Sequence, residues 1–367
     1  MVKVTVIRLE HLTKRFGDLV AVNDLNLTIN HGEFVCFLGP SGSGKTTLLR
    51  MIAGLETPTK GEIYFDDERV TDLPTPDRNI AMVFQFPAIY PSLTVYENIA
   101  VPLRAEGLSA DEIRKRVMWA AEMVGIKQYL NYRYGQLDMG TLQRVSIAKA
   151  IVRRPRVFLF DEPLSNLDAK LRDSLRYQFK KIHAEIKQTM IYVTHDQLEA
   201  MALADRIAIL KDGVLQQYDT PENIFYHPVN KFVAYFIGSP TINFIDATLH
   251  ISRERAYAEF GGATIDLGEI KDLLVERIGE TTKDYILGIR PQHVTISFEE
   301  IPNSFRSKVT TVESMGTSSL IELSRDNILF KALWEGSFPK KPGDEVWVRF
   351  DQNMIRVIDK KSEKVLV

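Results

Sequence analysis

Between Met1 and Gly238, apolar residues form short continuous runs that alternate with stretches in which they recur three or four positions apart. Continuous runs bounded by turn residues are typical of strands buried on both faces, and the longer spacing is typical of helices that cover a sheet. The predicted strands are Glu33–Leu38, Glu62–Phe65, Ile80–Phe84, Val157–Phe160 and Ile191–Thr194, and the predicted helices are Thr47–Ala53, Ser109–Val124 and Leu171–Ile186. This alternation predicts an α/β domain.

Strands are also predicted at the two ends of this region. The first segment alternates between apolar and other residues and predicts strands at Val4–Leu9 and Ala21–Ile29. At the other end, two apolar segments on either side of Asp212-Gly213 predict a closing hairpin of Ile207–Leu210 and Val214–Gln217.

The segment from Leu93 to Asn131 predicts a mostly helical insert in the α/β core. Ser109 and Glu112 have the spacing of a capping box at the start of one of its helices. Residues Ile113, Val117 and Val124 fall on one face of that helix, which would pack against the core.

The pattern of apolar and polar residues changes at about Gly238, where short alternating segments and turns replace the long predicted helices. The predicted strands are Ala256–Phe260, Ile286–Ile289, Val294–Phe298, Leu320–Leu323, Val346–Phe350 and Ile355–Ile358. We therefore predict two domains. Residues 1–237 form an α/β domain with a helical insert at about 93–152, and residues 238–367 form an all-β domain, a small barrel.

Composition narrows the classes of protein and the compartment. The 367 residues are 45% hydrophobic and 26% charged, with a net charge of −2, which argues against a general nucleic-acid binder. A single cysteine, Cys36, fits a reducing cytoplasm. The N-terminus lacks the features of a signal peptide, and no apolar run reaches the roughly 18 residues that span a bilayer. Any membrane role is expected to come through a partner.

The stretch from Gly39 to Thr46 fits the phosphate-binding pattern G-x-x-x-x-G-K-[ST] at every fixed position, between a predicted strand and a predicted helix. Its glycines let successive backbone N–H groups face one anion, and the helix N-terminus adds partial positive charge. Lys45 is expected to reach the β- and γ-phosphates, and the Thr46 hydroxyl to ligate Mg²⁺. The predicted nucleotide-binding residues of this stretch are Gly39, Pro40, Ser41, Gly42, Ser43, Gly44, Lys45, Thr46 and Thr47.

Further positions are ambiguous by themselves. Asp161 and Glu162 lie at the end of a predicted buried strand, and an acidic strand end alone is common and needs no function. In a chain that also has a phosphate loop, however, one of these carboxylates can hold Mg²⁺ through water and its neighbour can act as general base. His195 also follows a strand, where a histidine is usually structural but where α/β sheets keep their ligands. Phe16 is either a core or loop aromatic or a ring that stacks on a nucleotide base.

Taken together, these residues resemble the ATP-binding subunit of ATP-binding-cassette importers, closest to the maltose and multiple-sugar type. The likeness covers nearly the whole chain. Besides the phosphate loop, Val83-Phe-Gln85 resembles the family's Q-loop, and Leu159–Asp168 resembles the Walker B motif running into the D-loop. Gly288–His293 is similar to the motif of the family's C-terminal regulatory domain, which implies an oligonucleotide-fold-like barrel there.

The resemblance implies catalytic and metal roles. Asp161 would hold Mg²⁺ together with Thr46, and Glu162 would be the catalytic base. His195 would stabilise the γ-phosphate and the water bound to Glu162. Gln85 would contact Mg²⁺ or the attacking water and report to the permease.

The resemblance also implies the ligand and the partners. Phe16 would stack on adenine, and Ser165 to Asp168 would cross the interface of a homodimer. The implied cofactors are ATP and Mg²⁺. The implied partners are integral-membrane permease subunits and, indirectly, a solute-binding protein, with no nucleic acid, so the chain would lie peripherally on the cytoplasmic face of the membrane.

The chain departs from the family at one motif. Where the family has Leu-Ser-Gly-Gly-Gln, this chain has Leu137-Asp-Met-Gly-Thr141. In the family this segment caps a helix that faces the γ-phosphate of the ATP held by the other subunit, so Asp138 and Gly140 are predicted to contact that nucleotide across the dimer. We expect the departure to leave ATP binding intact and to slow hydrolysis.

Three functions are open on these grounds. The first is an ATPase that energises solute import, with sugars favoured by overall likeness. The second is a nucleotide-binding regulatory or degenerate subunit that barely hydrolyses ATP. The third, a soluble cassette protein acting on nucleic acid or ribosomes, ranks last because such proteins usually carry two cassettes and this chain has one.

Overall fold

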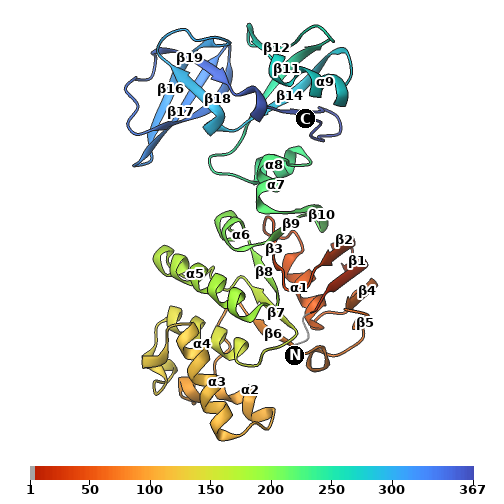
Figure 1. Cartoon of the computed structure of the whole chain (residues 1–367), viewed down its shortest axis with the longest axis vertical. Helices are drawn as coiled ribbons and strands as arrows, with labels where there is room; N and C mark the ends of the chain where they lie inside the picture. The colour runs from red at the N-terminus through yellow and green to blue at the C-terminus, as the bar shows by residue number, and fades with distance from the viewer. Residues whose placement is uncertain (1–4) are drawn as a thin grey trace. The chain divides into compact units, whose positions relative to one another are not determined.

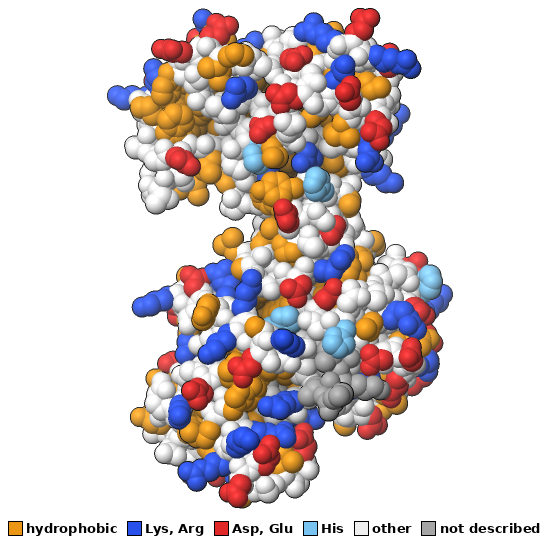
Figure 2. All heavy atoms as spheres, viewed as in Figure 1, with side chains coloured by type: hydrophobic (Ala, Val, Ile, Leu, Met, Phe, Trp, Pro, Cys, Tyr) orange, Lys and Arg blue, Asp and Glu red, His pale blue; other side chains and the backbone are white. Residues whose placement is uncertain are grey.

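The computed structural model describes residues 5–367, so the start of the strand predicted at Val4–Leu9 lies outside the described residues. Internal contacts divide the chain into two compact units, Met1–Pro221 and Glu222–Val367 (Figure 1). The sequence-based boundary at 237/238 remains a prediction. On the face shown in Figure 2, acidic and basic side chains are interspersed over both units, in keeping with the small net charge.

The first unit is built on a six-stranded, mostly parallel sheet with the order β10-β9-β3-β8-β7-β6. Its strands are β3 (Phe34–Leu38), β6 (Ile80–Val83), β7 (Val157–Asp161), β8 (Thr189–Thr194), β9 (Arg206–Lys211) and β10 (Val214–Asp219). Only β10 runs antiparallel, and it closes the sheet through the predicted hairpin. Strands β3, β7 and β8 are buried at every position, which explains why they appear in the sequence as continuous apolar runs.

A second, antiparallel sheet has the order β2-β1-β4-β5. Its strands are β1 (Ile7–Phe16), β2 (Leu19–Ile29), β4 (Lys60–Phe65) and β5 (Glu68–Arg69). The prediction that the first strand ends at Leu9 was wrong, because register shifts after Leu9 let β1 continue through polar residues as far as Phe16.

Six helices complete the first unit in the described part of the chain: α1 (Lys45–Ala53), α2 (Val95–Ala105), α3 (Ala110–Met123), α4 (Met139–Ile151), α5 (Ala169–Ile186) and α6 (Gln197–Leu203). Helix α1 is buried with residues of both sheets, since Leu48 and Ile52 share one apolar cluster with Leu9 and Phe37. Helices α2, α3 and α4 form the predicted helical insert (Figure 1).

The capping prediction was half right. Ser109 accepts a hydrogen bond from the Glu112 N–H at 3.3 Å, but the Glu112 carboxylate pairs with Arg116 instead of returning to Ser109. The complete capping box lies at the start of α2, between Thr94 and Glu97.

The second unit contains two five-stranded sheets, ordered β13-β12-β11-β14-β20 and β15-β19-β16-β17-β18, with one continuous apolar core. The strands are β11 (Asn243–Ile251), β12 (Ala256–Phe260), β13 (Ala263–Asp266), β14 (Thr281–Ile289), β15 (Val294–Ser297), β16 (Phe305–Ser314), β17 (Ser318–Arg325), β18 (Ile328–Glu335), β19 (Glu345–Phe350) and β20 (Arg356–Ile358). The short helices are α7 (Pro221–Tyr226), α8 (Lys231–Phe236) and α9 (Lys271–Arg277). All the predicted β segments fall in or next to these strands.

Two arginines, of which Arg290 is buried and Arg356 is half-buried, hold the short helices at the start of the second unit. Arg290 donates to Ile237 O at 2.5 Å and to Phe225 O at 2.9 Å, and Arg356 donates to Tyr226 O at 2.8 Å. Burial lowers the pKa of Arg290 to about 10, and the nearby Arg356 acts in the same direction. These donors satisfy carbonyl groups at the ends of α7 and α8 that have no partner within the helix.

Cutting the chain at Ser239 is expected to leave an N-terminal fragment that folds and binds nucleotide, because both sheets of the first unit end by Asp219. Helices α7 and α8 would lose Arg290 and Arg356, so we expect them to fray while the sheets stay intact. Nucleotide titration and circular dichroism of the fragment check this. An insoluble fragment without nucleotide binding would show that the β domain is integral to the core.

Candidate active site

The phosphate loop connects β3 to α1, and two of its glycines are required by close packing. A Cβ atom at Gly39 would lie 2.2 Å from Leu210 O, and one at Gly44 would lie 2.2 Å from Ala21 O. Gly44 also has a φ of 97°, a conformation that favours glycine, and it sits directly before the first turn of α1. The loop is therefore held between β2 and β9, with its N–H groups near a helix N-terminus, where anions bind.

Lys45 is buried within this loop. Its Nζ donates to Gly39 O and Pro40 O, both at 2.9 Å. Burial lowers the pKa of Lys45, while Glu162 and Asp161 act in the opposite direction and so lie within electrostatic reach of it. A phosphate oxygen would be a stronger, charge-assisted acceptor for the same ammonium group than the two carbonyls are.

Thr46 and Asp161 meet although 115 positions separate them. The Thr46 hydroxyl donates to Asp161 Oδ1 at 3.0 Å, and burial raises the pKa of the Asp161 carboxyl. In residues 5–367 no group of three or more His, Cys, Asp or Glu side chains could hold a metal by itself. A hydroxyl and a carboxylate beside a phosphate loop nevertheless fit Mg²⁺, which takes few protein ligands and completes its shell with phosphate and water.

Glu162 and His195 are also brought together. Strands β7 and β8 are parallel neighbours, so the residues that follow them emerge at the same edge of the sheet. His195 Nδ1 lies 3.4 Å from Glu162 Oε2, and the Glu162 N–H donates to Val193 O at 3.0 Å. Glu162 has a φ of 46°, an uncommon conformation for a residue other than glycine, which the pairing with β8 stabilises.

Gln85 lies against the predicted D-loop. Its Nε2 donates to the Ser165 hydroxyl at 3.2 Å, and that hydroxyl donates in turn to Glu162 O at 3.0 Å. Asn166 Nδ2 donates to Gln85 O at 3.4 Å. The structure thus connects Gln85 to the backbone of Glu162 through one serine.

Phe16 ends β1 and is 45% exposed, with Lys14 Nζ 4.8 Å from the centre of its ring. An exposed ring at a strand end can stack on a base. The pairing of β1 with β2 places Phe16 opposite Leu19, and β2 in turn contacts the phosphate loop at Ala21.

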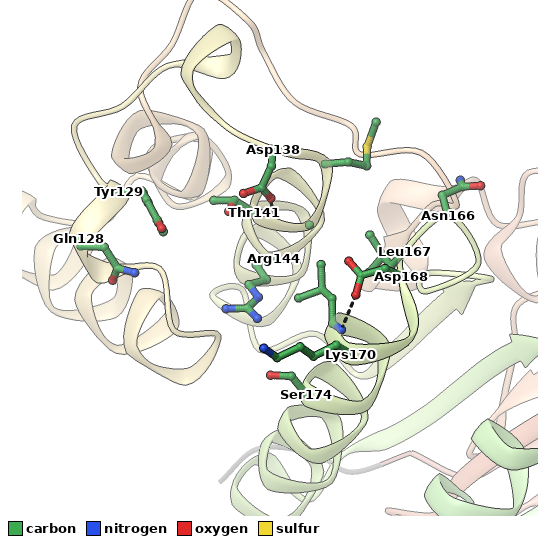
Figure 3. A pocket seen from close by; sticks show the side chains of 13 residues that line it. Gln128, Tyr129, Asp138, Thr141, Arg144, Asn166, Leu167, Asp168, Lys170 and Ser174 are labelled. Atoms are coloured by element: carbon green, nitrogen blue, oxygen red, sulfur yellow. Dashed lines mark hydrogen bonds between the residues drawn. The ribbon is translucent and has the colours of Figure 1, made fainter. Parts of the chain in front are cut away.

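The altered signature segment lies at the N-terminus of α4 and lines a pocket of about 570 Å³ with the start of α5 (Figure 3). Asp138 caps α4 by accepting from the Thr141 N–H at 2.7 Å. Gly140 is required here, because a Cβ would lie 2.0 Å from Leu171 Cδ2. Met139 is 43% exposed.

The pocket combines charges of both signs. Arg144 and Lys170 extend into the space between α4 and α5 in Figure 3, and Asp138 and Asp168 line the same pocket. Among the described residues, none of those lining it belongs to the phosphate loop. Within one chain the structure therefore does not bring Asp138 and Gly140 to Lys45, as expected if they act on the nucleotide of another subunit.

Two residues contact the turn formed by Thr194, His195 and Asp196, called the histidine turn below, and the sequence alone did not indicate them. Glu199 is 3% exposed and accepts hydrogen bonds from Tyr192 and Thr194, and Arg172 contacts Asp196. A charged residue on an amphipathic helix gives no local signal of such contacts. These contacts become visible only in the folded structure, where α5 and α6 lie beside the end of β8.

A curled glycine loop before a helix, a buried lysine and carboxylates at the ends of neighbouring parallel strands define the class of phosphate-loop nucleotide hydrolases. Models of known protein families match three parts of the chain. Residues 22–165 match the ABC transporter family, residues 238–294 match the MalK OB fold domain, and residues 287–358 match the TOBE domain.

Individual relatives extend this likeness over the whole chain. The chain is 42% identical to the trehalose/maltose import ATP-binding protein MalK of Thermococcus litoralis, covering 98% of this chain and 99% of that protein. It is also 42% identical to the oligosaccharides import ATP-binding protein MsmX of Bacillus subtilis, covering 97% and 98%. A solved dimeric ATP-binding cassette in a post-hydrolysis state, bound to ADP and Pi, is similar with 35% identity and a TM-score of 0.54, covering 59% of this chain and 98% of that one.

The chain therefore belongs to the ABC transporter family, as an ATP-binding and ATP-hydrolysing subunit that energises solute import. None of the helices in residues 5–367 is long and apolar enough to cross a membrane.

Proposed function

We propose that two copies of this chain close over two ATP molecules and drive the import of a sugar through membrane-embedded permease subunits. The observation that carries the proposal is the joint presence, in one site, of buried Lys45, the Thr46–Asp161 pair and the Glu162–His195 pair. Two of the relatives that match nearly the full length are, by name, a trehalose/maltose import protein and an oligosaccharides import protein, which supports the choice of sugar. The similar dimeric cassette supports the homodimer.

Each side chain has a role that its position supports. Lys45 and the loop N–H groups bind the phosphates, and Thr46 and Asp161 would hold Mg²⁺, which would neutralise phosphate charge. Glu162 accepts the proton of the attacking water, and His195, 3.4 Å away, orients that water and the γ-phosphate. Gln85 senses the state of this site through Ser165.

A groove beside Gln85 fits the proposed permease contact. It has a volume of about 310 Å³ and is lined mainly by apolar residues, with two basic residues. The lining residues are Leu55, Thr75, Ile80, Ala81, Met82, Phe84, Ala88, Pro102, Ser146, Lys149, Ala150 and Arg153. Phe86, next to the groove in sequence, is 66% exposed. An amphipathic segment of a permease would cover these side chains and place the chain on the cytoplasmic face of the membrane, and a solute-binding protein would act on the permease from the other side.

The regulatory alternative has no support among these relatives, which are import proteins by name. Steady-state ATP hydrolysis by the purified chain, alone and with its permease subunits, tests the proposal. We expect hydrolysis that the permease stimulates. Absence of hydrolysis in both conditions, with ATP still bound, would favour the regulatory alternative.

Lys45→Ala is expected to weaken ATP binding about 10- to 100-fold, because hydrogen bonds to a charged group are worth roughly 1.5–3 kcal/mol. Titration with a fluorescent ATP analogue measures the change. Lys60→Ala is the matched control, since Lys60 is exposed on β4. Equal affinities in the Lys45→Ala variant and the unmodified protein would contradict the assignment of the phosphate loop.

A further inference from the structure

Arg172, in the first turn of α5, connects two separate segments of the site. Its Nη1 lies 3.3 Å from Asp196 Oδ2, and its Nη2 donates to Leu167 O at 3.2 Å. Leu167 belongs to the D-loop, and Asp196 directly follows His195. One guanidinium group therefore contacts both the D-loop and the histidine turn.

The histidine turn is fixed on its other side by α6. Asp196 Oδ1 accepts from the N–H groups of Leu198 and Glu199, which leaves Oδ2 for Arg172. The Thr194 hydroxyl accepts from the Asp196 N–H at 3.0 Å and donates to Glu199 Oε2 at 2.7 Å. The residues before and after His195 thus have fixed partners.

His195 itself is free of such constraints. Its side chain is 59% exposed, and its described polar contact is Glu162 at 3.4 Å. The position of the ring relative to Glu162 is therefore set by Thr194 and Asp196, and through Asp196 by Arg172.

We propose that Arg172 is a positioning residue that ties the histidine turn to the D-loop, so that a shift of the D-loop changes the distance between His195 and Glu162. This inference rests on the catalytic roles proposed above for those two residues. An arginine suits the task because its planar fork presents two N–H groups to two acceptors at fixed geometry, whereas a lysine is a single point charge. The ion pair is about a third exposed and adds little stability, so its effect is on geometry.

The first test compares Arg172→Lys and Arg172→Ala with the unmodified chain in steady-state ATP hydrolysis. We expect kcat to fall roughly 10- to 100-fold, because small misplacements of catalytic groups cost that much, while KM for ATP changes less than about twofold. Asp196→Asn should lower kcat similarly, and the double variant should be no worse than either single one.

Arg176→Ala is the matched control. Arg176 lies one turn further along α5 and pairs with Asp173 of the same helix, with no contact to the D-loop or the histidine turn among the described interactions. It should leave kcat and KM unchanged. Unchanged kcat in Arg172→Ala, or equal losses in Arg172→Ala and Arg176→Ala, would overturn the inference.

A second measurement needs no turnover and separates this inference from the proposed function. The NMR signal of the His195 ring, identified by its loss in His195→Ala, should shift in Arg172→Ala and stay in place in Arg176→Ala. An unmoved signal in Arg172→Ala would rule out the link. A shifted signal together with full activity in His195→Ala would retain the link and reject the role of His195.

Discussion

Glu162→Gln should lower ATP hydrolysis about 10²- to 10⁴-fold while ATP stays bound, because the change removes a general base and little else. Glutamine has nearly the same shape as glutamate and still offers a hydrogen-bond acceptor toward His195, but it cannot take a proton from water. The binding groups, Lys45 and Thr46, make their hydrogen bonds to other residues, and the change leaves those bonds in place. Since hydrolysis no longer opens the assembly, we expect a stable dimer with ATP trapped inside it.

Single-turnover hydrolysis and size-exclusion chromatography with and without ATP measure the two effects. Glu185→Gln is the control, because Glu185 is exposed on α5 and accepts a hydrogen bond from Trp119, which glutamine can also accept. Hydrolysis by Glu162→Gln at the unmodified rate would show that another group is the base. Loss of ATP binding would show that Glu162 stabilises the phosphate loop instead of acting on the attacking water.

The parts of the fold that were predictable depend on local patterns. β3, β7 and β8 are buried throughout, so each contains a continuous apolar run, and β7 and β8 end in the polar residues Asp161 and Thr194. The phosphate loop is recognisable because its chemistry needs glycines, a lysine and a hydroxyl at fixed spacing. The altered signature was visible only against the pattern of a family.

The parts that were not predictable depend on partners distant in sequence. Arg78 is 1% exposed and donates to Met51 O and Ile52 O at the end of α1, and Arg290 does the same for α7 and α8. An arginine in a polar stretch predicts an exposed side chain, and nothing local marks it as a buried donor. Arg172 is only half-buried, but it too was missed because its partners, Leu167 O and Asp196, come from two separate segments.

The structure changes the interpretation of the signature segment in one respect. Within the chain Asp138 is well accommodated, since it caps α4 as a serine would, and the Met139 side chain is exposed. In the proposed dimer, a defect would arise only when a second subunit brings its ATP to this helix. A carboxylate about 4 Å from a phosphate charge would repel it by roughly 4 kcal/mol at an effective dielectric of about 20, before relaxation.

Restoring the family pattern with Asp138→Ser, Met139→Gly and Thr141→Gln should raise ATP turnover about 10²- to 10³-fold, the usual value of one transition-state donor. The three changes should fold. A serine at position 138 can still accept a hydrogen bond from the backbone N–H of residue 141, and Met139 is 43% exposed, outside the buried core. The pocket of about 570 Å³ beside Thr141 can take the longer glutamine side chain. ATP affinity of the monomer should not change, because Phe16 and Gly39–Thr46 are untouched.

Asp138→Asn separates the effect of the added charge from the effect of the missing serine hydroxyl, because asparagine keeps the size and the helix cap of Asp138 but removes its charge. If repulsion dominates, Asp138→Asn should recover most of the gain; if the missing hydroxyl donor dominates, only the serine variant should. Turnover and ATP affinity are measured for all variants at one protein concentration, since dimer formation depends on it. Equal turnover in the restored and unmodified proteins would show that Asp138 is tolerated at the closed interface and that this segment is no defect.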